Sequence, residues 1–199
     1  MLFSDEARAM IRPHRTYAAL GASDEWDGRM LAAKIAMLQL ALGGWVSLTT
    51  AGRLVAAHVA MTALFWAFVP FWQVVGVLVA LRVVAPKTPR VRALCLYFVG
   101  HGPWLGLLLV ISGVCIFAPN VYAAMMTLLT SGALPGALLV AFAWGGVLTW
   151  ALFRSGLSLS RGRAAAATAI FYLVFIGAIV GYYFVTDQIL PQFFWSPAP

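Results

Sequence analysis

Long apolar runs, separated by short polar stretches, dominate the chain and predict its architecture. Five such runs are present, at 35–52, 55–81, 93–117, 134–153 and 164–185. Each approaches or exceeds the roughly 20 residues that a helix needs to cross the hydrocarbon core of a bilayer, about 30 Å thick. None shows the alternation of apolar and polar positions that is typical of a membrane β-strand. The pattern predicts an all-α integral membrane protein with a five-helix transmembrane bundle.

The N-terminal segment differs from the rest of the chain because it is polar and charged. Ser4 can cap a helix whose first turn holds Asp5 and Glu6, where acidic side chains interact favourably with the helix dipole. Pro13 would end this helix or start another. Basic residues recur at helical spacing at Arg8, Arg12 and Arg15. We expect a short interfacial helix here.

The same pattern divides the chain into three parts. Residues 1–28 form a cytoplasmic or interfacial N-terminal segment, and residues 29–189 form the five-span membrane domain. Residues 190–199 are expected to form a short tail outside the membrane, because they contain several prolines and follow the last apolar run.

The distribution of basic residues predicts how the chain is threaded. If the N-terminus lies in the cytoplasm and all five runs cross, every Lys and Arg except Arg53 lies on the inner side, as the positive-inside rule requires. A first run lying flat would move both basic loops outside. These loops carry the residues expected to set topology and contact anionic lipids: Arg82, Lys87, Arg90, Arg92, Arg154, Arg161 and Arg163.

Composition supports a membrane location and indicates its source. Of the 199 residues, 63% are hydrophobic and 10% are charged, whereas soluble domains are about half apolar and a quarter charged. The formal charge is +7, but the basic residues cluster between apolar runs, so we expect no nucleic-acid partner. Arg outnumbers Lys, and Ala is abundant, which is typical of a GC-rich bacterial genome. We expect a multi-pass protein of the bacterial inner membrane, with its C-terminus outside.

The acidic residues exclude several classes of membrane protein. Between Gly28 and Thr186 there is no Asp or Glu. Proton-coupled carriers use intramembrane carboxylates, aspartyl proteases need two Asp, and headgroup transferases need acidic metal ligands. We therefore expect a protein that is not an enzyme, with no catalytic residue and no metal site.

Two histidines in the spans raise the question of haem. His58 lies near the outer end of the second run and His101 lies nearer the inner end of the third. At the rise of a helix their heights differ by roughly 15–20 Å, too far apart for one iron. No cofactor is expected. His101 is a candidate cofactor-binding residue because Gly100-His101-Gly102-Pro103 can open the helix and expose carbonyls.

Prolines and glycines mark positions where helices bend or approach closely. Pro70 and Pro103 each remove a backbone donor from a span, so we expect kinks at both. The pairs Gly102–Gly106 and Gly177–Gly181 have the small-xxx-small spacing that lets helices pack closely. Their partner is either another span of this chain, which we favour for the second pair, or a second protein.

Three segments give the chain a family resemblance. They are residues 11–16 before the first span, the basic loop and broken helix at 89–104, and residues 156–164 at the start of the last span. Over about residues 8–189 the chain resembles the Yip family, in its bacterial branch. The resemblance implies five spans, a cytoplasmic N-terminus and no known catalytic residue. The link of eukaryotic members to small GTPases is not carried over, because this N-terminal segment is much shorter than theirs.

These observations leave three functions open. The first is a non-enzymatic scaffold or accessory subunit of a membrane complex, including one that organises lipid, with membrane lipids and another membrane protein or a second copy as partners. The second is a small-molecule or lipid transport protein that uses the kinked second and third spans. The third is a haem-binding membrane subunit that uses His101.

Overall fold

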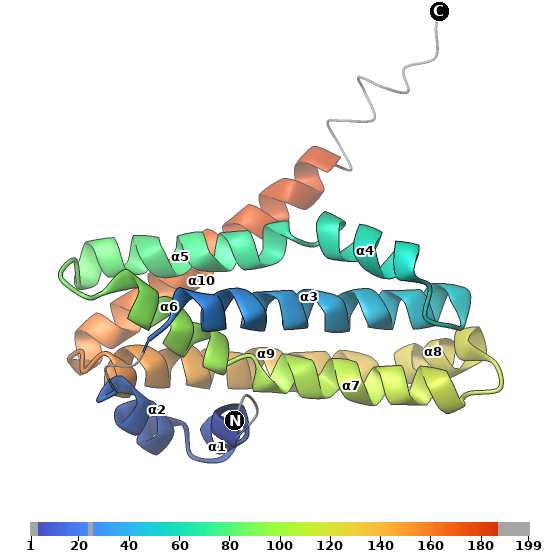
Figure 1. Ribbon diagram of the computed structural model, residues 1–199, viewed down its shortest axis with the longest axis horizontal. Coiled ribbons are helices and arrows are strands. Elements are labelled where there is room, and N and C mark those ends of the chain that lie inside the picture. The colour runs from blue at the N-terminus through green and yellow to red at the C-terminus, as the bar shows by residue number, and fades with distance from the viewer. Residues whose placement is uncertain (1–3, 24–25, 187–199) are drawn as a thin grey trace, which may run out of the picture.

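The structure, a computed structural model, describes residues 4–23 and 26–186. Within these residues every regular element is a helix, and five helices are long and apolar enough to cross a membrane (Figure 1). The predicted all-α membrane bundle is thereby confirmed. The expected outer tail at 190–199 lies outside the described residues.

The spans are built, in the described part of the chain, from seven α-helices and one π-helix. Span one is α3 (Gly28–Ala51), span two is α4 (Ala56–Phe65) with α5 (Phe68–Val84), and span three is α6 (Arg90–Val99) with α7 (Gly102–Phe117). Span four is α9 (Ala133–Ala151) running into the π-helix η1 (Leu152–Gly156), and span five is α10 (Arg161–Phe184). Three shorter helices lie outside the spans: α1 (Ser4–Ile11), α2 (Pro13–Gly21) and α8 (Val121–Thr130).

Span one begins earlier than its apolar run predicts. The side chain of Asp27 accepts a hydrogen bond from the Arg29 amide and caps α3 at its start. Lys34, which marked the edge of the predicted span, lies inside the helix and is buried. Its Nζ lies 2.6 Å from Oε1 of the buried Glu6, so the charge has a partner and does not end the span.

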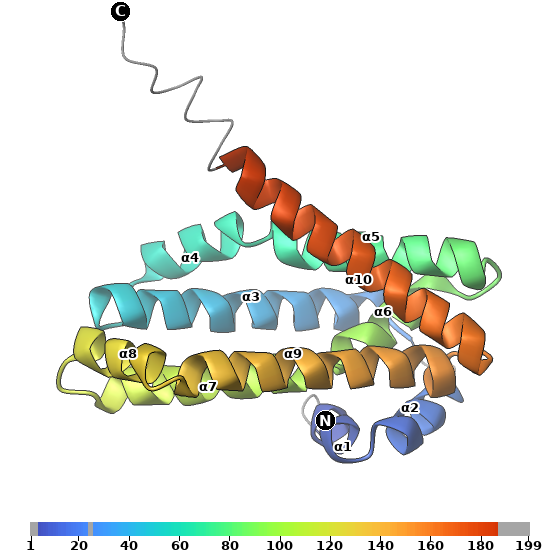
Figure 2. The ribbon, with the colours of Figure 1, turned by 180° about the vertical axis from the view of Figure 1, so that it is seen from behind.

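Four helices, α3, α5, α7 and α9, run roughly along the long axis, and α10 crosses α5 obliquely (Figure 2). Gly76 of α5 allows this crossing, since a Cβ at this position would lie 3.0 Å from the ring of Phe171. Towards its C-terminal end α10 diverges from the other spans (Figure 2). The bundle is therefore tightest at one end, where the core residues Val77, Ala80 and Phe153 are fully buried.

Spans two and three are both interrupted near their prolines. The first interruption is at Trp66–Ala67, one turn before Pro70, and the second is at Gly100–His101, just before Pro103. Pro70 has no N–H to donate to the carbonyl of Trp66, four residues earlier. Nε2 of Gln39, on α3, donates to that carbonyl at 3.4 Å. The Val69 amide also donates to this carbonyl, at 3.0 Å, so the Gln39 side chain adds a second hydrogen bond that joins span one to span two at the break.

The turn between α3 and α4 brings these helices close together. Gly52 ends α3 in the left-handed conformation, with φ of 65°, and its N–H bonds to the Leu48 carbonyl. The buried Ser47 accepts a hydrogen bond from the Val55 amide and donates one to the Arg53 carbonyl. Gly43 lies where the helices touch, because a Cβ at this position would be 2.6 Å from the Val59 carbonyl oxygen.

The N-terminal helices α1 and α2 dock against the bundle. Met10 packs on Gly102, and its carbonyl accepts a hydrogen bond from Nε1 of Trp144 at 3.1 Å. The end of α2 touches η1 so closely that a Cβ on Gly21 would overlap the Gly156 carbonyl oxygen. With the Glu6–Lys34 pair, these contacts fix both helices to spans one, three and four.

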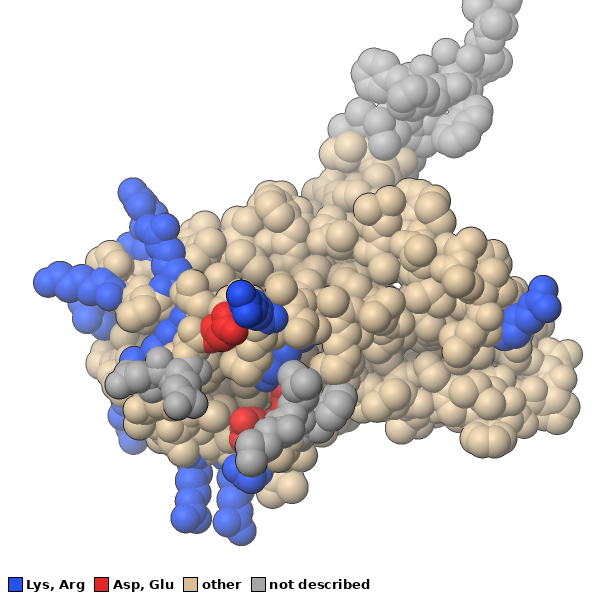
Figure 3. Space-filling model, viewed as in Figure 1, with Lys and Arg blue, Asp and Glu red and all other residues tan. Residues whose placement is uncertain are grey.

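Charged residues gather at one end of the molecule, and an isolated basic group lies at the other (Figure 3). The loop between α5 and α6, the loop between η1 and α10, and helix α2 all lie at the charged end (Figure 1). Arg53 belongs to the turn between α3 and α4, at the opposite end (Figure 1). The charge asymmetry predicted along the chain is therefore also an asymmetry in space.

The glycine pairs do not pack against other spans. Among the described residues, apart from chain neighbours and the nearby backbone of the same helix, no atom lies within 4 Å of a Cβ built on Gly106, Gly177 or Gly181. Gly102 does make a close contact, but with Met10 and Glu6 of α1. The internal contact favoured for Gly177–Gly181 is not formed, because α10 diverges there. Contact of this pair with a second protein stays a prediction.

Candidate functional site

The interruptions of spans two and three lie beside a partly open cavity inside the bundle, with a volume of about 400 Å³. All five spans contribute to its wall, and Tyr17 of α2 contributes at the charged end. Pro70 and His101, both singled out from the sequence, line it. The predicted kinks therefore do more than shape the spans, because the cavity forms beside them.

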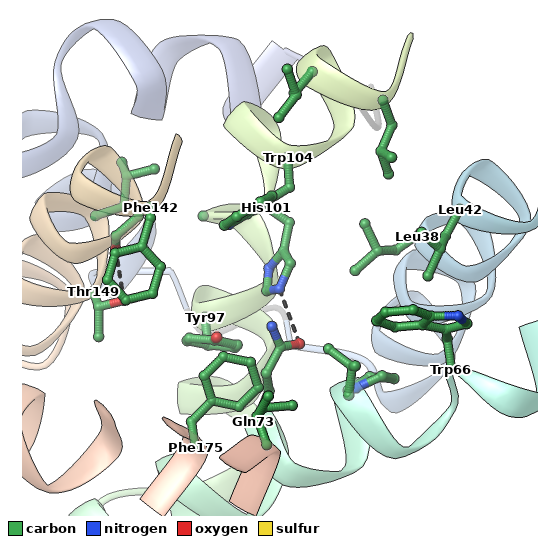
Figure 4. Close-up of a pocket in the computed structure, with 18 of the residues that line it drawn as sticks. Leu38, Leu42, Trp66, Gln73, Tyr97, His101, Trp104, Phe142, Thr149 and Phe175 are labelled. Atoms are coloured by element: carbon green, nitrogen blue, oxygen red, sulfur yellow. Dashed lines mark hydrogen bonds between the residues drawn. The ribbon is translucent and has the colours of Figure 1, made fainter. Parts of the chain in front are cut away.

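Most of the cavity wall is apolar or aromatic. Leu38 and Leu42 of α3 lie with Trp66 on one side, and Phe142 of α9 lies on the other (Figure 4). Such a wall is typical of sites for small apolar ligands, which hold few polar groups at fixed positions.

Two polar side chains in the cavity wall, His101 and Gln73, are hydrogen-bonded to each other. Nε2 of His101 lies 3.2 Å from Oε1 of Gln73 (Figure 4). Because the amide oxygen is an acceptor, this bond requires the proton on Nε2. His101 is 5% exposed and stacks on Phe98, with a ring-centroid distance of 4.7 Å. The pair joins span three at its break to span two just after its break.

Three buried polar atoms on the cavity's lining residues have no hydrogen-bond partner of good geometry among the described residues. They are Oε1 of Gln39, Nε1 of Trp45 and Nδ1 of His101. The backbone of Tyr97, one turn earlier, lies close to the His101 ring. Leaving a buried donor or acceptor unpaired costs roughly 1–3 kcal/mol. The cavity thus offers an unpaired donor on Trp45 and an unpaired acceptor on Gln39, both on α3.

Tyr17 closes the cavity at the charged end. It is 1% exposed, and a Cβ on Gly100 would lie 2.8 Å from its hydroxyl oxygen. Only glycine at the break of span three leaves room for this ring. Burial, with a smaller contribution from the Glu6 carboxylate, raises the pKa of the Tyr17 hydroxyl well above its usual value. Tyr17 therefore remains neutral at physiological pH.

His58, the other histidine considered for haem, does not meet His101. It is exposed near the start of α4 and is not among the residues lining the cavity. In the part of the chain that the structure describes, no group of three or more His, Cys, Asp or Glu side chains is placed to hold a metal ion.

Three cavity residues were missed in the sequence: Gln39, Gln73 and Trp45. Gln39 and Gln73 are the only glutamines within the five apolar runs, and amide side chains in membrane spans commonly bond to neighbouring helices. That signal was available and would have identified both. Trp45 carried no such signal, because aromatic residues are frequent throughout this sequence.

Comparison with protein-family models, curated proteins and solved structures gives no match to this chain. The resemblance to the Yip family accordingly stays a prediction.

Proposed function

We propose that this membrane protein binds a mainly apolar small molecule or lipid chain, with at least one polar group, in the cavity beside the breaks in spans two and three. This is the second of the functions that the sequence left open. The observation that carries it is the set of unpaired polar atoms, on Gln39, Trp45 and His101, around an otherwise apolar cavity. A ligand hydroxyl group could accept from Nε1 of Trp45 and donate to Oε1 of Gln39 or Nδ1 of His101, whereas a carbonyl group could pair only with Trp45.

The size and chemistry of the cavity support a ligand of this class. A volume of about 400 Å³ falls in the range of small-molecule sites, roughly 300–1,000 Å³. Nε1 of Trp45 can donate only to an acceptor, and Oε1 of Gln39 can accept only from a donor. The protein is proposed to bind or move this molecule without chemical conversion. A scaffold role served by the exposed Gly177–Gly181 pair and a haem role for His101 stay hypotheses.

Filling the cavity should remove the ligand. Gly145 lines the cavity, and a Cβ at this position meets only Trp104 and Tyr172, at 3.7 and 3.8 Å. We expect Gly145→Leu to reduce the amount of a specifically copurifying small molecule at least tenfold. The measurement is mass spectrometry of an organic extract of the purified protein, normalised to protein.

The adjacent glycine provides the control. Gly146 also lies within α9 but does not line the cavity, so Gly146→Leu should retain the ligand. Trp45→Phe removes the unpaired N–H while keeping an aromatic ring, so it should weaken ligand binding and leave the ligand-free protein as stable or more stable. If both glycine variants and the wild type carry the same extractable molecules in equal amounts, the cavity is not the site.

We also propose that the charged end faces the cytoplasm of a bacterial inner membrane. In a variant whose buried Cys95 and Cys115 are replaced by alanine, Pro86→Cys should resist a membrane-impermeant maleimide in intact cells. Leu54→Cys, at the opposite end and 66% exposed, should react. Labelling after permeabilisation confirms that the thiol introduced at position 86 is accessible. Reaction at position 86 and protection at position 54 in intact cells would reverse the orientation.

A further inference from the structure

A second, polar hollow of about 510 Å³ lies at the charged end, separate from the apolar cavity. His14 of α2, Arg154 and Ser155 of η1, Ser158 of the following loop and Arg161, the first residue of α10, line it. Two segments distant in sequence, α2 and residues 150–161, thus bring two guanidinium groups, an imidazole and two hydroxyls to one place.

The positive charge of this hollow has no counter-charge within the described chain. The Arg161 side chain makes no hydrogen bond or ion pair with any described residue, and Nη1 of Arg154 donates only to the Leu159 carbonyl, at 2.8 Å. The described carboxylates are used elsewhere. Asp5 pairs with Arg8, Glu6 pairs with Lys34 and Asp27 caps α3.

The helix that begins at this hollow adds to the positive potential. The first turn of α10 contains Arg161 and Arg163 and no acidic residue. Cations at a helix N-terminus are unfavourable, because the helix dipole already places partial positive charge there. An anion in the hollow would neutralise both contributions. Across the loop, Ser158 has φ of 53°, the only positive φ of a non-glycine residue among those described.

The hollow also supplies donors suited to an oxyanion. Nδ1 of His14 lies 2.8 Å from Oγ of Ser155. If the serine hydroxyl donates to Nδ1, the imidazole Nε2–H stays free to donate. If Nδ1 donates to the serine, the hydroxyl hydrogen stays free. Either arrangement leaves a neutral donor beside the guanidinium groups, which bind phosphate oxygens in bidentate fashion.

We propose that this hollow binds a phosphate group, held by Arg154, Arg161 and the His14–Ser155 pair. Its source is either free phosphate or the headgroup of an anionic phospholipid, which present the same chemistry to these side chains. The site is independent of the ligand proposed for the apolar cavity.

The test uses the full chain in phosphatidylcholine nanodiscs at constant ionic strength. In one arm, inorganic phosphate is titrated and tryptophan fluorescence is followed, since Trp150 also lines the hollow. In the other, phosphatidic acid is added to the nanodisc lipid and its retention on the protein is measured by native mass spectrometry. Saturable binding in the first arm identifies free phosphate as a ligand. Retention in the second arm alone identifies a lipid headgroup.

Arg161→Gln is the diagnostic variant, because the exposed side chain has no partner whose loss would unfold the protein. We expect at least tenfold weaker binding in whichever arm is positive. Arg90→Gln removes an equal charge at the same end but outside the hollow, and should change binding by less than twofold. If both variants lose binding equally, the binding reflects general charge attraction and the proposal is overturned. Absence of binding in both arms would also overturn it.

Discussion

Glu6→Gln is expected to lower the free energy of unfolding by about 3 kcal/mol, near the lower end of the range for breaking a buried ion pair. The carboxylate accepts from Nζ of Lys34 at 2.6 Å, and both side chains are less than a tenth exposed. Replacement by glutamine leaves the Lys34 ammonium buried without its counter-charge. The amide oxygen still accepts one hydrogen bond, which limits the loss. Thermal or denaturant unfolding in detergent micelles measures the change.

The neighbouring acidic residue provides a matched control. Asp5 pairs with Arg8 on the surface of the same helix, at 3.5 Å, with the Arg8 side chain 70% exposed. Because exposed pairs contribute about 0–1 kcal/mol, Asp5→Asn should change stability little. Glu6→Leu combined with Lys34→Met removes both charges and should recover much of the loss. A Glu6→Gln protein as stable as the Asp5→Asn protein would show that α1 does not depend on this pair.

Gly43→Ala is expected to destabilise the bundle by about 1–3 kcal/mol, the range for overpacking a core. The added methyl would lie 2.6 Å from the Val59 carbonyl oxygen, so α3 and α4 must separate. Backbone atoms, unlike the end of a flexible side chain, cannot rotate out of the way. Unfolding in detergent, followed by circular dichroism, measures this effect.

Gly44→Ala is the control for that substitution. A Cβ at this position meets only Cδ2 of Leu54, at 3.7 Å, which is ordinary contact. Since alanine is favoured over glycine by about 1 kcal/mol in a helix interior, Gly44→Ala should be neutral or stabilising. If the two variants unfold alike, α3 and α4 do not approach as closely as the structure shows.

The spans and their interruptions were predictable because their causes are local in sequence. A bilayer requires an apolar helix of roughly 20 residues, and five runs approached or exceeded that length. Pro70 and Pro103 remove a backbone donor wherever they stand, so a break near each follows from the residue itself. The structure adds that the Gln39 side chain bonds to the Trp66 carbonyl at the break, which also accepts from the Val69 amide.

The cavity was less predictable because its polar groups come from different spans. His101 and Pro70 stood out individually, but nothing in the sequence indicates that Gln73, 28 residues before His101, lies 3.2 Å from it. Its pairing depends on how spans two and three are packed. That the Trp45 indole N–H lacks a partner is even harder to predict from the sequence, since it depends on which side chains fail to reach the indole.

The N-terminal helices were predicted from local sequence, but their contact with span one, the Glu6–Lys34 ion pair, was not. Ser4, Asp5 and Pro13 predicted a helix and its end, and α1 and α2 occupy these positions. No sequence pattern indicated that Glu6 pairs with Lys34, because Lys34 looked like the edge of a span. A charged lysine can be buried without a large energetic cost only when the fold places a carboxylate beside it.

The docking of α2 on η1 also has a consequence for biosynthesis. His14 and Ser155, which bond in the folded chain, are 141 residues apart. At about 5–20 residues per second, the ribosome makes His14 roughly 7–28 s before Ser155. During that interval α2 has been synthesised but its partner has not. An amphipathic, basic segment near a membrane is attracted to anionic lipid, so we expect the nascent helices to wait on the bilayer surface. The sequence-based prediction that this segment is interfacial stays a prediction for the finished protein, in which α1 and α2 dock against the bundle.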